Sequence, residues 1–310
     1  MKVFVTGSSG FVGSHIVREL QRAGGAVYGF DREPPLPGAS PDEYNAGDVA
    51  DGDGLAAAVR RIRPEAIVHC AAITPAIDEL RVAREILLVN VQSTMTLLEA
   101  AAGIRCEKFV YLSSAGVYRD PEPGTALTEE SSVDDGGSLY AQTKLASERL
   151  LIWARRVLGV ITTSLRVGPV YGEFERPTTT RSRMSPLYRA VHLARNGDVL
   201  SCNSWDSTLN FIHGDDVGRA LLAVLNADSP GQTYNVAGAP VSMRETAEAI
   251  AQLYPETRVD WSRDVSDPTL PIRLPDRPVS SALIARDLGV TQGITLLDGI
   301  SRVIDAGTLP

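Results

Sequence analysis

The stretch Lys2-Val-Phe-Val-Thr6-Gly7-Ser-Ser-Gly10-Phe-Val-Gly13 decides the fold of this chain. A short apolar run leads into a glycine-rich turn, and the segment 11–23 that follows carries apolar side chains at helical spacing. Glycines at a strand-to-helix turn let the backbone approach a pyrophosphate, which binds at the N-terminus of the helix. The stretch therefore predicts a dinucleotide-binding unit. Its candidate cofactor-binding residues are Gly7, Gly10, Phe11, Val12 and Gly13.

An acidic residue lies where such a unit needs one. Asp31 ends the second apolar run, Ala26–Asp31, 18 residues after Gly13. A carboxylate at this position can accept hydrogen bonds from the adenosine ribose and repel a 2′-phosphate, so the pattern predicts NAD as the cofactor. NADP is the less favoured alternative. It stays open because Arg32 follows directly, and an arginine beside this site can accommodate the phosphate.

The first two-thirds of the chain alternate between strand-like and helix-like segments. The remaining strand candidates are 66–72, 108–113 and 160–167, and the remaining helix candidates are 54–63, 80–102 and 138–158. The strand candidates are short and continuously apolar, which is typical of parallel strands covered on both faces. The alternation predicts an α/β fold with a Rossmann-type, doubly wound parallel sheet.

The pattern changes near Gly168 and becomes less regular. Ser242-Met-Arg-Glu245 predicts a capped helix that runs to about Leu253. The other features of this part are a strand-like run at 233–236, a proline-rich segment at 255–278 and a candidate helix at 296–304. We expect a smaller C-terminal substrate-binding lobe here. The expected division is an NAD-binding domain over 1–167 with 210–230 returning to it, and a substrate-binding lobe over 168–209 and 231–310.

Composition excludes several classes of function. The chain has 310 residues and a formal net charge of −8, which argues against a broad nucleic-acid surface. Its three cysteines are an odd, sparse set, typical of reduced thiols in a cytoplasmic protein, and no spacing suggests a metal site. The N-terminus enters a short strand and a glycine-rich turn, so we expect no signal peptide and no membrane span.

Tyr140-Ala-Gln-Thr-Lys144 is the candidate catalytic motif. A spacing of four residues on a helix puts both side chains on one face. A tyrosine is a poor base at neutral pH, but a nearby ammonium favours the phenolate and makes proton exchange with a substrate hydroxyl feasible. Ser113-Ser114 ends the strand before this helix and offers a hydroxyl for the same substrate oxygen. We therefore predict Ser114, Tyr140 and Lys144 as the catalytic set.

With these motifs in this order, the chain resembles the extended short-chain dehydrogenase/reductase superfamily, specifically the NAD-dependent epimerase/dehydratase family. The resemblance covers about residues 1–250. Besides the two motifs above, its matching segments are 47–51, 69–72, Asn90, 113–118, 165–172, 210–216 and 234–236.

The resemblance implies roles for individual residues. Ser114 and Tyr140 match the family's catalytic serine and proton-exchanging tyrosine, and Lys144 matches its ribose-binding partner. Further implied cofactor residues are Asp48, Val49, Ala71, Ala72, Asn90, Pro169 and Val170. Thr74, Ser114 and Tyr118 are implied on the substrate side, whereas His69 is expected to be a packed, hydrogen-bonded histidine. The family usually forms dimers, which implies a homodimer through helices 80–102 and 138–158.

Three departures from the family pattern bear on the reaction. Ala115-Gly116 replaces the Asp-Glu pair that follows the catalytic residue in dehydratases, so we expect that the protein is not a dehydratase. Leu209 stands where nucleotide-sugar members commonly carry an arginine, which places a nucleotide-sugar substrate in doubt. Arg273 resembles a later diphosphate-binding arginine of the family.

The loop 175–184 contains three threonines and three arginines. Such a loop can bind a carboxylate or phosphate by charge-assisted hydrogen bonds, and the alternative interpretation is a solvated surface loop. The candidate substrate residues here are Thr179, Arg181 and Arg183.

The predicted reaction is NAD-dependent hydride transfer at a hydroxyl-bearing carbon of a sugar-like small molecule. We favour an epimerase of the nucleotide-sugar 4-epimerase type. A net dehydrogenase or reductase of a smaller anionic sugar or sugar acid is the alternative, because the same Ser/Tyr/Lys set serves both reactions. A non-catalytic dinucleotide sensor is a more remote alternative.

Overall fold

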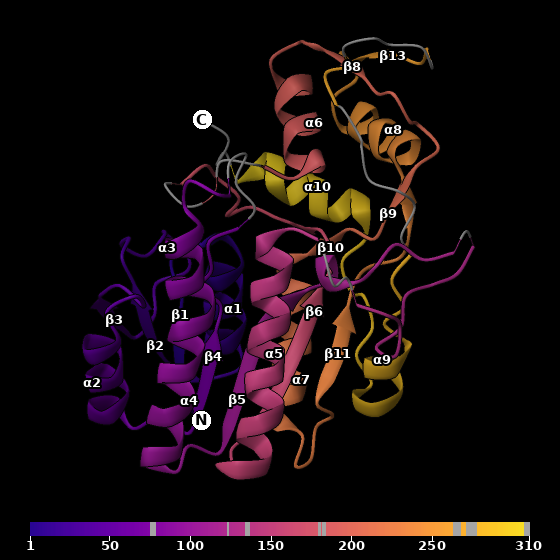
Figure 1. Cartoon of the computed structure of the whole chain (residues 1–310). Helices are drawn as coiled ribbons and strands as arrows, with labels where there is room; N and C mark the ends of the chain where they lie inside the picture. Colours follow the sequence, from indigo (N-terminus) through magenta and orange to yellow (C-terminus); the bar gives the residue numbers. More distant parts are fainter. Residues whose placement is uncertain are drawn as a thin grey trace.

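The computed structural model describes residues 1–74, 79–122, 124–133, 137–178, 181, 184–262, 268–270 and 278–306. Its centre is a seven-stranded parallel sheet in the order β3-β2-β1-β4-β5-β6-β11 (Figure 1). The strands are β1 (Lys2–Thr6), β2 (Ala26–Asp31), β3 (Glu43–Ala46), β4 (Ala66–His69), β5 (Lys108–Ser114), β6 (Ile161–Val167) and β11 (Thr233–Val236). The predicted doubly wound sheet is confirmed.

Helices cover both faces of this sheet, because its central strands carry apolar side chains in both directions. Val3 and Val5 of β1 face a core shared with α1 (Phe11–Arg22) and α7 (Gly214–Asn226). Phe4, between them, faces the opposite core, as the two-residue period of a strand requires. The helices on that side are α2 (Gly52–Ile62), α4 (Ser93–Ile104) and α5 (Leu139–Val157).

The helix predicted at 80–102 is one continuous run, Ala83–Ile104, with a turn of π-helix in its middle. It consists of α3 (Ala83–Leu87), the π-turn Leu88–Gln92 and α4. By length and composition this helix could cross a membrane, with a mean hydropathy of 1.2, but half of that window is buried inside the protein. Leu97, Leu98 and Ala101 pack against the sheet core, so the helix has the apolar character of a core helix.

Strand β11 departs from the expected division of the chain. Residues 231–310 were assigned to the substrate-binding lobe, but β11 pairs in parallel with β6 as the edge strand of the main sheet. Helix α9 (Ala282–Leu288) also packs against the main sheet, since Ile284 is buried in the core formed by β1, α1 and α7.

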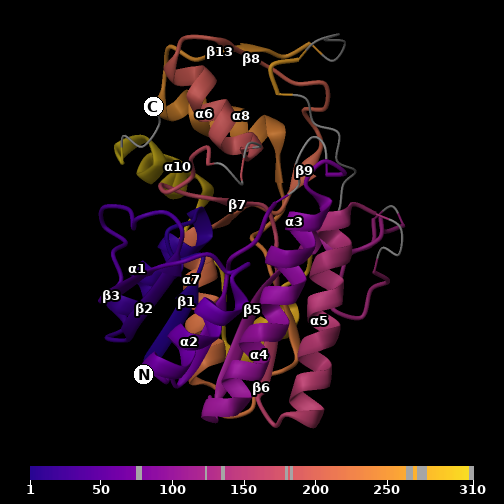
Figure 2. The ribbon, with the colours of Figure 1, turned by 60° about the vertical axis from the view of Figure 1, so that its left-hand side comes forward.

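A second lobe lies over the carboxyl ends of the strands (Figures 1 and 2). Its core joins α6 (Pro186–Arg195), α8 (Met243–Leu253) and α10 (Leu296–Asp305) around buried Trp205. The short strands of this half are β7 (Val170–Tyr171), β8 (Val199–Ser201), β9 (Thr208–Leu209), β10 (Ile212–His213), β12 (Val241–Ser242) and β13 (Arg258–Asp260). The predicted capping box is present, since Ser242 and Glu245 bond reciprocally.

Candidate active site

A cavity of about 520 Å³ lies at the carboxyl ends of the strands, lined by both lobes. This is where ligands bind in open parallel sheets. Most predicted site residues line it: Gly7, Gly10, Phe11, Val12, Gly13, Asp31, Arg32, Asp48, Val49, Ala71, Ala72, Thr74, Ser114, Tyr140, Lys144, Pro169, Val170 and Arg181.

The glycine-rich turn between β1 and α1 permits a close backbone approach. Gly7 has a φ of +68°, and a Cβ there would come within 2.6 Å of the backbone nitrogen of Ala71. A Cβ at Gly13 would lie 1.9 Å from the carbonyl oxygen of Gly7. Larger residues at either position would push the turn away from the neighbouring strand and from any ligand.

The first turn of α1 faces this cavity with its N–H groups uncapped. The N-cap residue Gly10 offers no side-chain hydrogen bond, and the first turn contains no acidic residue. Phe11, Val12 and Gly13 line the cavity. A helix N-terminus in this state complements a negatively charged group, so these residues fit the diphosphate of a dinucleotide.

Asp31 lies at the cavity edge with its carboxylate held by backbone N–H groups. Ser9 N–H donates to Oδ2 and Glu33 N–H donates to Oδ1, each at 3.0 Å. Arg32 turns toward acidic groups instead, with Nη1 3.4 Å from an oxygen of Asp48 and 4.0 Å from one of Glu85. The carboxylate is thereby held in a fixed position at the edge of the cavity.

Two predicted site residues do not line the cavity. Asn90 is buried in the π-turn, where its amide accepts from Ile73 N–H at 2.8 Å and donates to Ile73 O at 3.1 Å. It therefore shapes the segment after β4 instead of lining the cavity. Tyr118, expected on the substrate side, is buried and donates to Asn235 Oδ1 at 2.6 Å. Its hydroxyl is directed into this contact because β11 pairs with β6.

The predicted catalytic residues meet in the cavity wall. Ser114 ends β5 and Tyr140 lies at the start of α5, and both line the cavity. Lys144, one turn further along α5, donates from Nζ to Leu112 O at 2.7 Å. The same Nζ lies 5.6 Å from the centre of the Tyr140 ring.

The pKa of Tyr140 differs from the sequence-based expectation that the nearby ammonium favours the phenolate. Burial raises the pKa of Tyr140, and the neighbouring side chain of Ser114 and the charge of Arg181 only partly oppose this rise. Burial also lowers the pKa of Lys144 to about 8, against the opposing effects of Cys70 and Glu148. In the cofactor-free protein Tyr140 is therefore a neutral hydroxyl that can donate a proton.

A buried polar network supports α5 from below. Ser113 Oγ donates to Glu148 Oε1 at 2.6 Å, and Arg166 holds both carboxylate oxygens, at 3.0 and 2.7 Å. His69 is packed and hydrogen-bonded, as predicted. Its ring nitrogens contact Thr6 Oγ1 at 2.7 Å and Ser93 Oγ at 3.0 Å, and burial lowers its pKa to about 3.

The second lobe contributes several polar side chains to the cavity. Arg176, Thr178, Arg181 and Arg189 line it, with Arg181 paired to Glu175 at 2.5 Å. Thr179, Arg183 and Arg273, predicted on this side, lie outside the described residues. Sequence reasoning missed Arg189 and also Ser9, which lies between two of the motif glycines. Leu209 is buried in the core of the second lobe.

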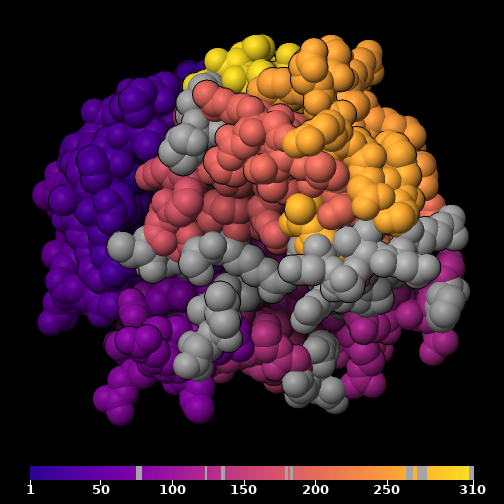
Figure 3. Space-filling view, turned by 90° about the horizontal axis from the view of Figure 1, so that it is seen from above, coloured from indigo at the N-terminus to yellow at the C-terminus, as the bar shows by residue number. Residues whose placement is uncertain are grey.

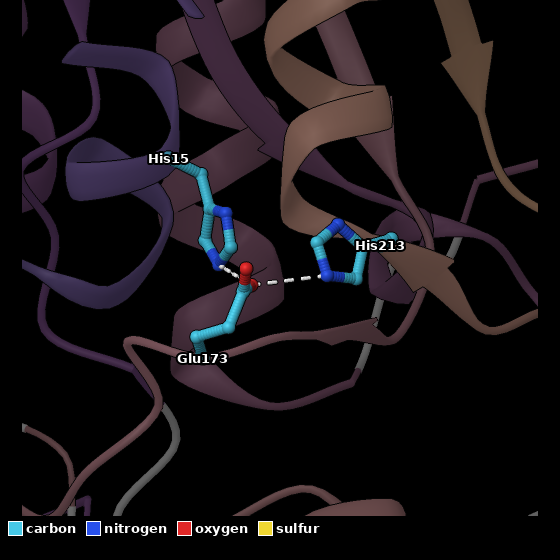
Figure 4. A group of neighbouring side chains, drawn as sticks. All are labelled: His15, Glu173 and His213. Atoms are coloured by element: carbon cyan, nitrogen blue, oxygen red, sulfur yellow. Dashed lines mark ion pairs between the residues drawn. The ribbon is translucent and has the colours of Figure 1, made fainter. Parts of the chain in front are cut away.

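A buried polar cluster links α1 to the chain after β7 (Figure 4). Within the described residues, His15, Glu173 and His213 are the one group whose ligand atoms could surround a metal ion. However, His213 Nδ1 accepts the N–H of Asp215 at 3.1 Å, and its Nε2 lies 3.0 Å from Glu173 Oε2. Arg18 binds the other oxygen of Glu173 at 3.1 Å. We interpret the cluster as a hydrogen-bonded anchor between the lobes.

Comparison with known proteins gives one consistent picture. A family model described as "NAD dependent epimerase/dehydratase family" matches residues 3–237. A 3β-hydroxysteroid dehydrogenase/Δ5→4-isomerase of Mycobacterium tuberculosis is 33% identical, over 83% of this chain and 72% of the relative. The structure of UDP-glucose 4-epimerase from Thermus thermophilus with NAD has a TM-score of 0.83 at 25% identity, covering 99% of this chain and 98% of that one. MoeE5 in complex with UDP-glucose and NAD has a TM-score of 0.79 at 28% identity, with the same coverage.

The comparison corrects the expectation that dehydration is excluded. Human dTDP-D-glucose 4,6-dehydratase is 28% identical over 98% of this chain and 89% of its own length. Ala115 and Gly116 do lack a proton-carrying side chain, but any element of the cavity wall can bring an acid to the substrate. The absence of the acid pair at these two positions therefore does not exclude elimination.

Proposed function

Since the chain belongs to the NAD-dependent epimerase/dehydratase family, we propose that it binds NAD and catalyses epimerase-type hydride transfer on a nucleotide sugar. The observation that carries this proposal is the meeting of Ser114, Tyr140 and Lys144 in one cavity with the glycine-rich turn. In this proposal the cofactor binds at the carboxyl ends of the main-sheet strands, and the substrate binds between the main sheet and the second lobe.

In the proposed mechanism Tyr140 exchanges a proton with the substrate hydroxyl. Ser114 holds the substrate oxygen, because its Oγ already accepts Gly116 N–H at 3.0 Å and its own proton is free to be donated. When bound, NAD would supply the redox chemistry, as acceptor and then donor of a hydride. Lys144, whose Nζ lies 5.6 Å from the centre of the Tyr140 ring, would hold the nicotinamide ribose, and its positive charge would favour loss of the phenolic proton.

We propose NAD and not NADP as the physiological cofactor. The Asp31 carboxylate is held by two backbone N–H groups beside the cavity, where a 2′-phosphate would meet a like charge. Arg32 could offset that repulsion, but it lies toward Asp48 and Glu85.

Two arginines support a substrate that carries a diphosphate or carboxylate. Arg181 and Arg189 line the cavity from the second lobe, and Arg181 acts electrostatically on Tyr140. They would supply the positive charge that Leu209 cannot. The structural relatives include complexes with UDP-glucose and UDP-glucuronic acid, which fit this substrate class.

A net NAD-dependent dehydrogenase is the second candidate. The similarity to a mycobacterial hydroxysteroid dehydrogenase favours it. The two candidates differ in the fate of the cofactor, because a dehydrogenase must release NADH. An assay with NAD and a panel of nucleotide sugars, free sugars and hydroxysteroids separates them: epimers without net NADH support the first, and stoichiometric NADH supports the second.

We also propose a homodimer formed by the continuous helix 83–104 and by α5. These helices lie side by side on the surface (Figure 2). Leu87, Trp153 and Val157 on them are unusually exposed for apolar residues, the last at 62%. An apolar surface shared by two adjacent helices fits burial against a second copy.

A further inference from the structure

Arg176 joins the second lobe to the glycine-rich turn. It lies in the segment between β7 and α6, and its Nη2 donates to the carbonyl oxygen of Ser9 at 3.2 Å. Ser9 is between Gly7 and Gly10, and both Ser9 and Arg176 line the cavity. In Figure 3 this part of the chain, in salmon, lies against the indigo N-terminal part.

Hydrogen-bond donors without acceptors converge at this point. Ser9 is 1% exposed, yet its Oγ has no hydrogen-bond partner among the described residues. The buried Nη1 of Arg176 likewise has none there. The first turn of α1 adds its uncapped N–H groups on the same side of the cavity. Buried donors normally have acceptors, so this arrangement indicates an anionic ligand with several oxygens.

We propose that Arg176 binds the diphosphate of the dinucleotide cofactor, together with Ser9 Oγ and the N-terminus of α1. This inference rests on the proposed function only in that it takes the ligand to be a dinucleotide. A guanidinium is suited to the task because it presents two N–H groups in one plane to phosphate oxygens. The loop arginines were expected to recognise the substrate, and Arg176 is here assigned to the cofactor instead.

The position of Arg176 is enforced by the anchor three residues before it. Glu173 Oε2 lies 3.0 Å from His213 Nε2 (Figure 4). Arg18 binds the other carboxylate oxygen of Glu173 at 3.1 Å. The ring of Phe174 packs 4.8 Å from that of His15, which lies on α1. The segment therefore follows α1 closely, and Arg176 is held beside the turn that α1 begins.

This assignment has a functional consequence. A cofactor held by both lobes leaves only after the contact with Arg176 is lost, which slows its release. Slow release suits an epimerase, whose reduced cofactor must stay bound until the intermediate is reduced again. Loss of Arg176 should therefore weaken binding of diphosphate ligands and should make NADH exchange faster.

Calorimetric titration of the purified protein tests the proposal, with NAD, ADP-ribose, adenosine and UDP as separate ligands. For Arg176→Ala we expect about 10- to 100-fold weaker binding of NAD and ADP-ribose, the loss typical of one charge-assisted hydrogen bond, and unchanged binding of adenosine. Arg176→Gln, which keeps much of the side-chain volume, should show the same pattern. Arg189→Ala, from the same cavity wall, should leave the affinity for ADP-ribose intact.

Three outcomes overturn the proposal: unchanged ADP-ribose affinity in both Arg176 variants, an equal loss for adenosine, or a loss confined to UDP. The last would assign Arg176 to the substrate's diphosphate. Failure of the proposed function is distinguishable, because a wild-type protein that binds ADP-ribose through Arg176 but converts no nucleotide sugar refutes only the reaction.

Discussion

Ser114 at the end of β5 and Tyr140 in the first turn of α5 line one cavity, and the side chain of Ser114 lowers the pKa of Tyr140 against the opposing effect of burial. The two residues belong to one βαβ unit, since α5 connects β5 to β6, and the parallel pairing of these strands places the start of α5 at the carboxyl end of β5. With Ser114 also accepting Gly116 N–H, its hydroxyl geometry is set before any substrate binds. In the proposed mechanism, the substrate oxygen would lie between these two side chains.

Replacing Tyr140 by Phe should reduce turnover by a factor of about 10² to 10⁴, the usual contribution of a general acid/base. Only the proton-carrying oxygen is removed, so the affinity for NAD should change little. Steady-state kinetics and an NAD titration measure both. The matched control is Tyr118→Phe, which removes a hydroxyl bound to Asn235 outside the cavity and should leave turnover near normal. Near-normal activity of the Tyr140 variant would exclude this residue as the acid/base.

Asp31 should determine the choice of cofactor. We expect wild-type protein to bind NAD more tightly than NADP. Asp31→Ser should weaken the binding of NAD by about 10- to 100-fold, because a charged hydrogen-bond acceptor is lost. The difference in affinity between NAD and NADP should become smaller. Arg32→Ala is the control and should not reverse the preference. Titration of both cofactors decides the matter, and tighter NADP binding by wild type would show that Arg32 dominates.

Lys144 should leave a signature in the pH dependence of stability of the cofactor-free protein. Burial lowers its pKa from 10.5 to about 8. Between these values the unfolded chain binds more protons than the folded one, so Lys144 makes the folded state more stable as the pH rises from 8 to 10.5. Chemical denaturation across this range should show that gain as the difference in unfolding free energy between wild type and the Lys144→Met variant. Lys144→Met should lack it, while the contributions of the buried tyrosines stay common to both proteins. Parallel curves for the two would contradict the assigned burial.

The proposed dimer depends on the exposed apolar surface of helices 83–104 and α5. Trp153→Glu with Val157→Glu should convert a dimer into a monomer, because two charges would be buried against the partner. Trp261→Glu is the control, since Trp261 has a similar exposure to Trp153, 39% against 40%, but lies in the second lobe. Sedimentation velocity measures the mass of each protein in solution. A monomeric wild type, or a double variant that remains a dimer, would refute this interface.

The sequence predicted the core of the fold because periodicity and glycine placement agree there. The limits of β1 and β2 match the prediction to the residue, and α1 ends one residue earlier than expected. Strand β3 was missed because its residues, Glu43–Ala46, form a polar, partly exposed edge. Helix α6 carried a signal that could have revealed it: Ser185 is the N-cap and Pro186 the first helical residue.

The site was predictable where motifs are local and not where distant segments meet. Ser114, Tyr140 and Lys144 follow from two short segments of sequence. In contrast, Tyr118 bonds to Asn235, 117 residues away, and no local pattern reports that contact. The contact of Arg176 with Ser9 spans 167 residues and depends on the anchor at Glu173, so the role of this arginine appears only in three dimensions.

The central claim, epimerase-type hydride transfer on a nucleotide sugar, is tested most directly by product analysis with NAD present. The protein is incubated separately with UDP-glucose, dTDP-glucose and UDP-glucuronic acid, with Tyr140→Phe in parallel. Chromatography detects epimers, and absorbance detects NADH. We predict that at least one substrate reaches an equilibrium of two epimers without accumulation of NADH, and that Tyr140→Phe forms neither. Stoichiometric NADH, an elimination product, or the absence of any epimer from all three substrates would contradict the account.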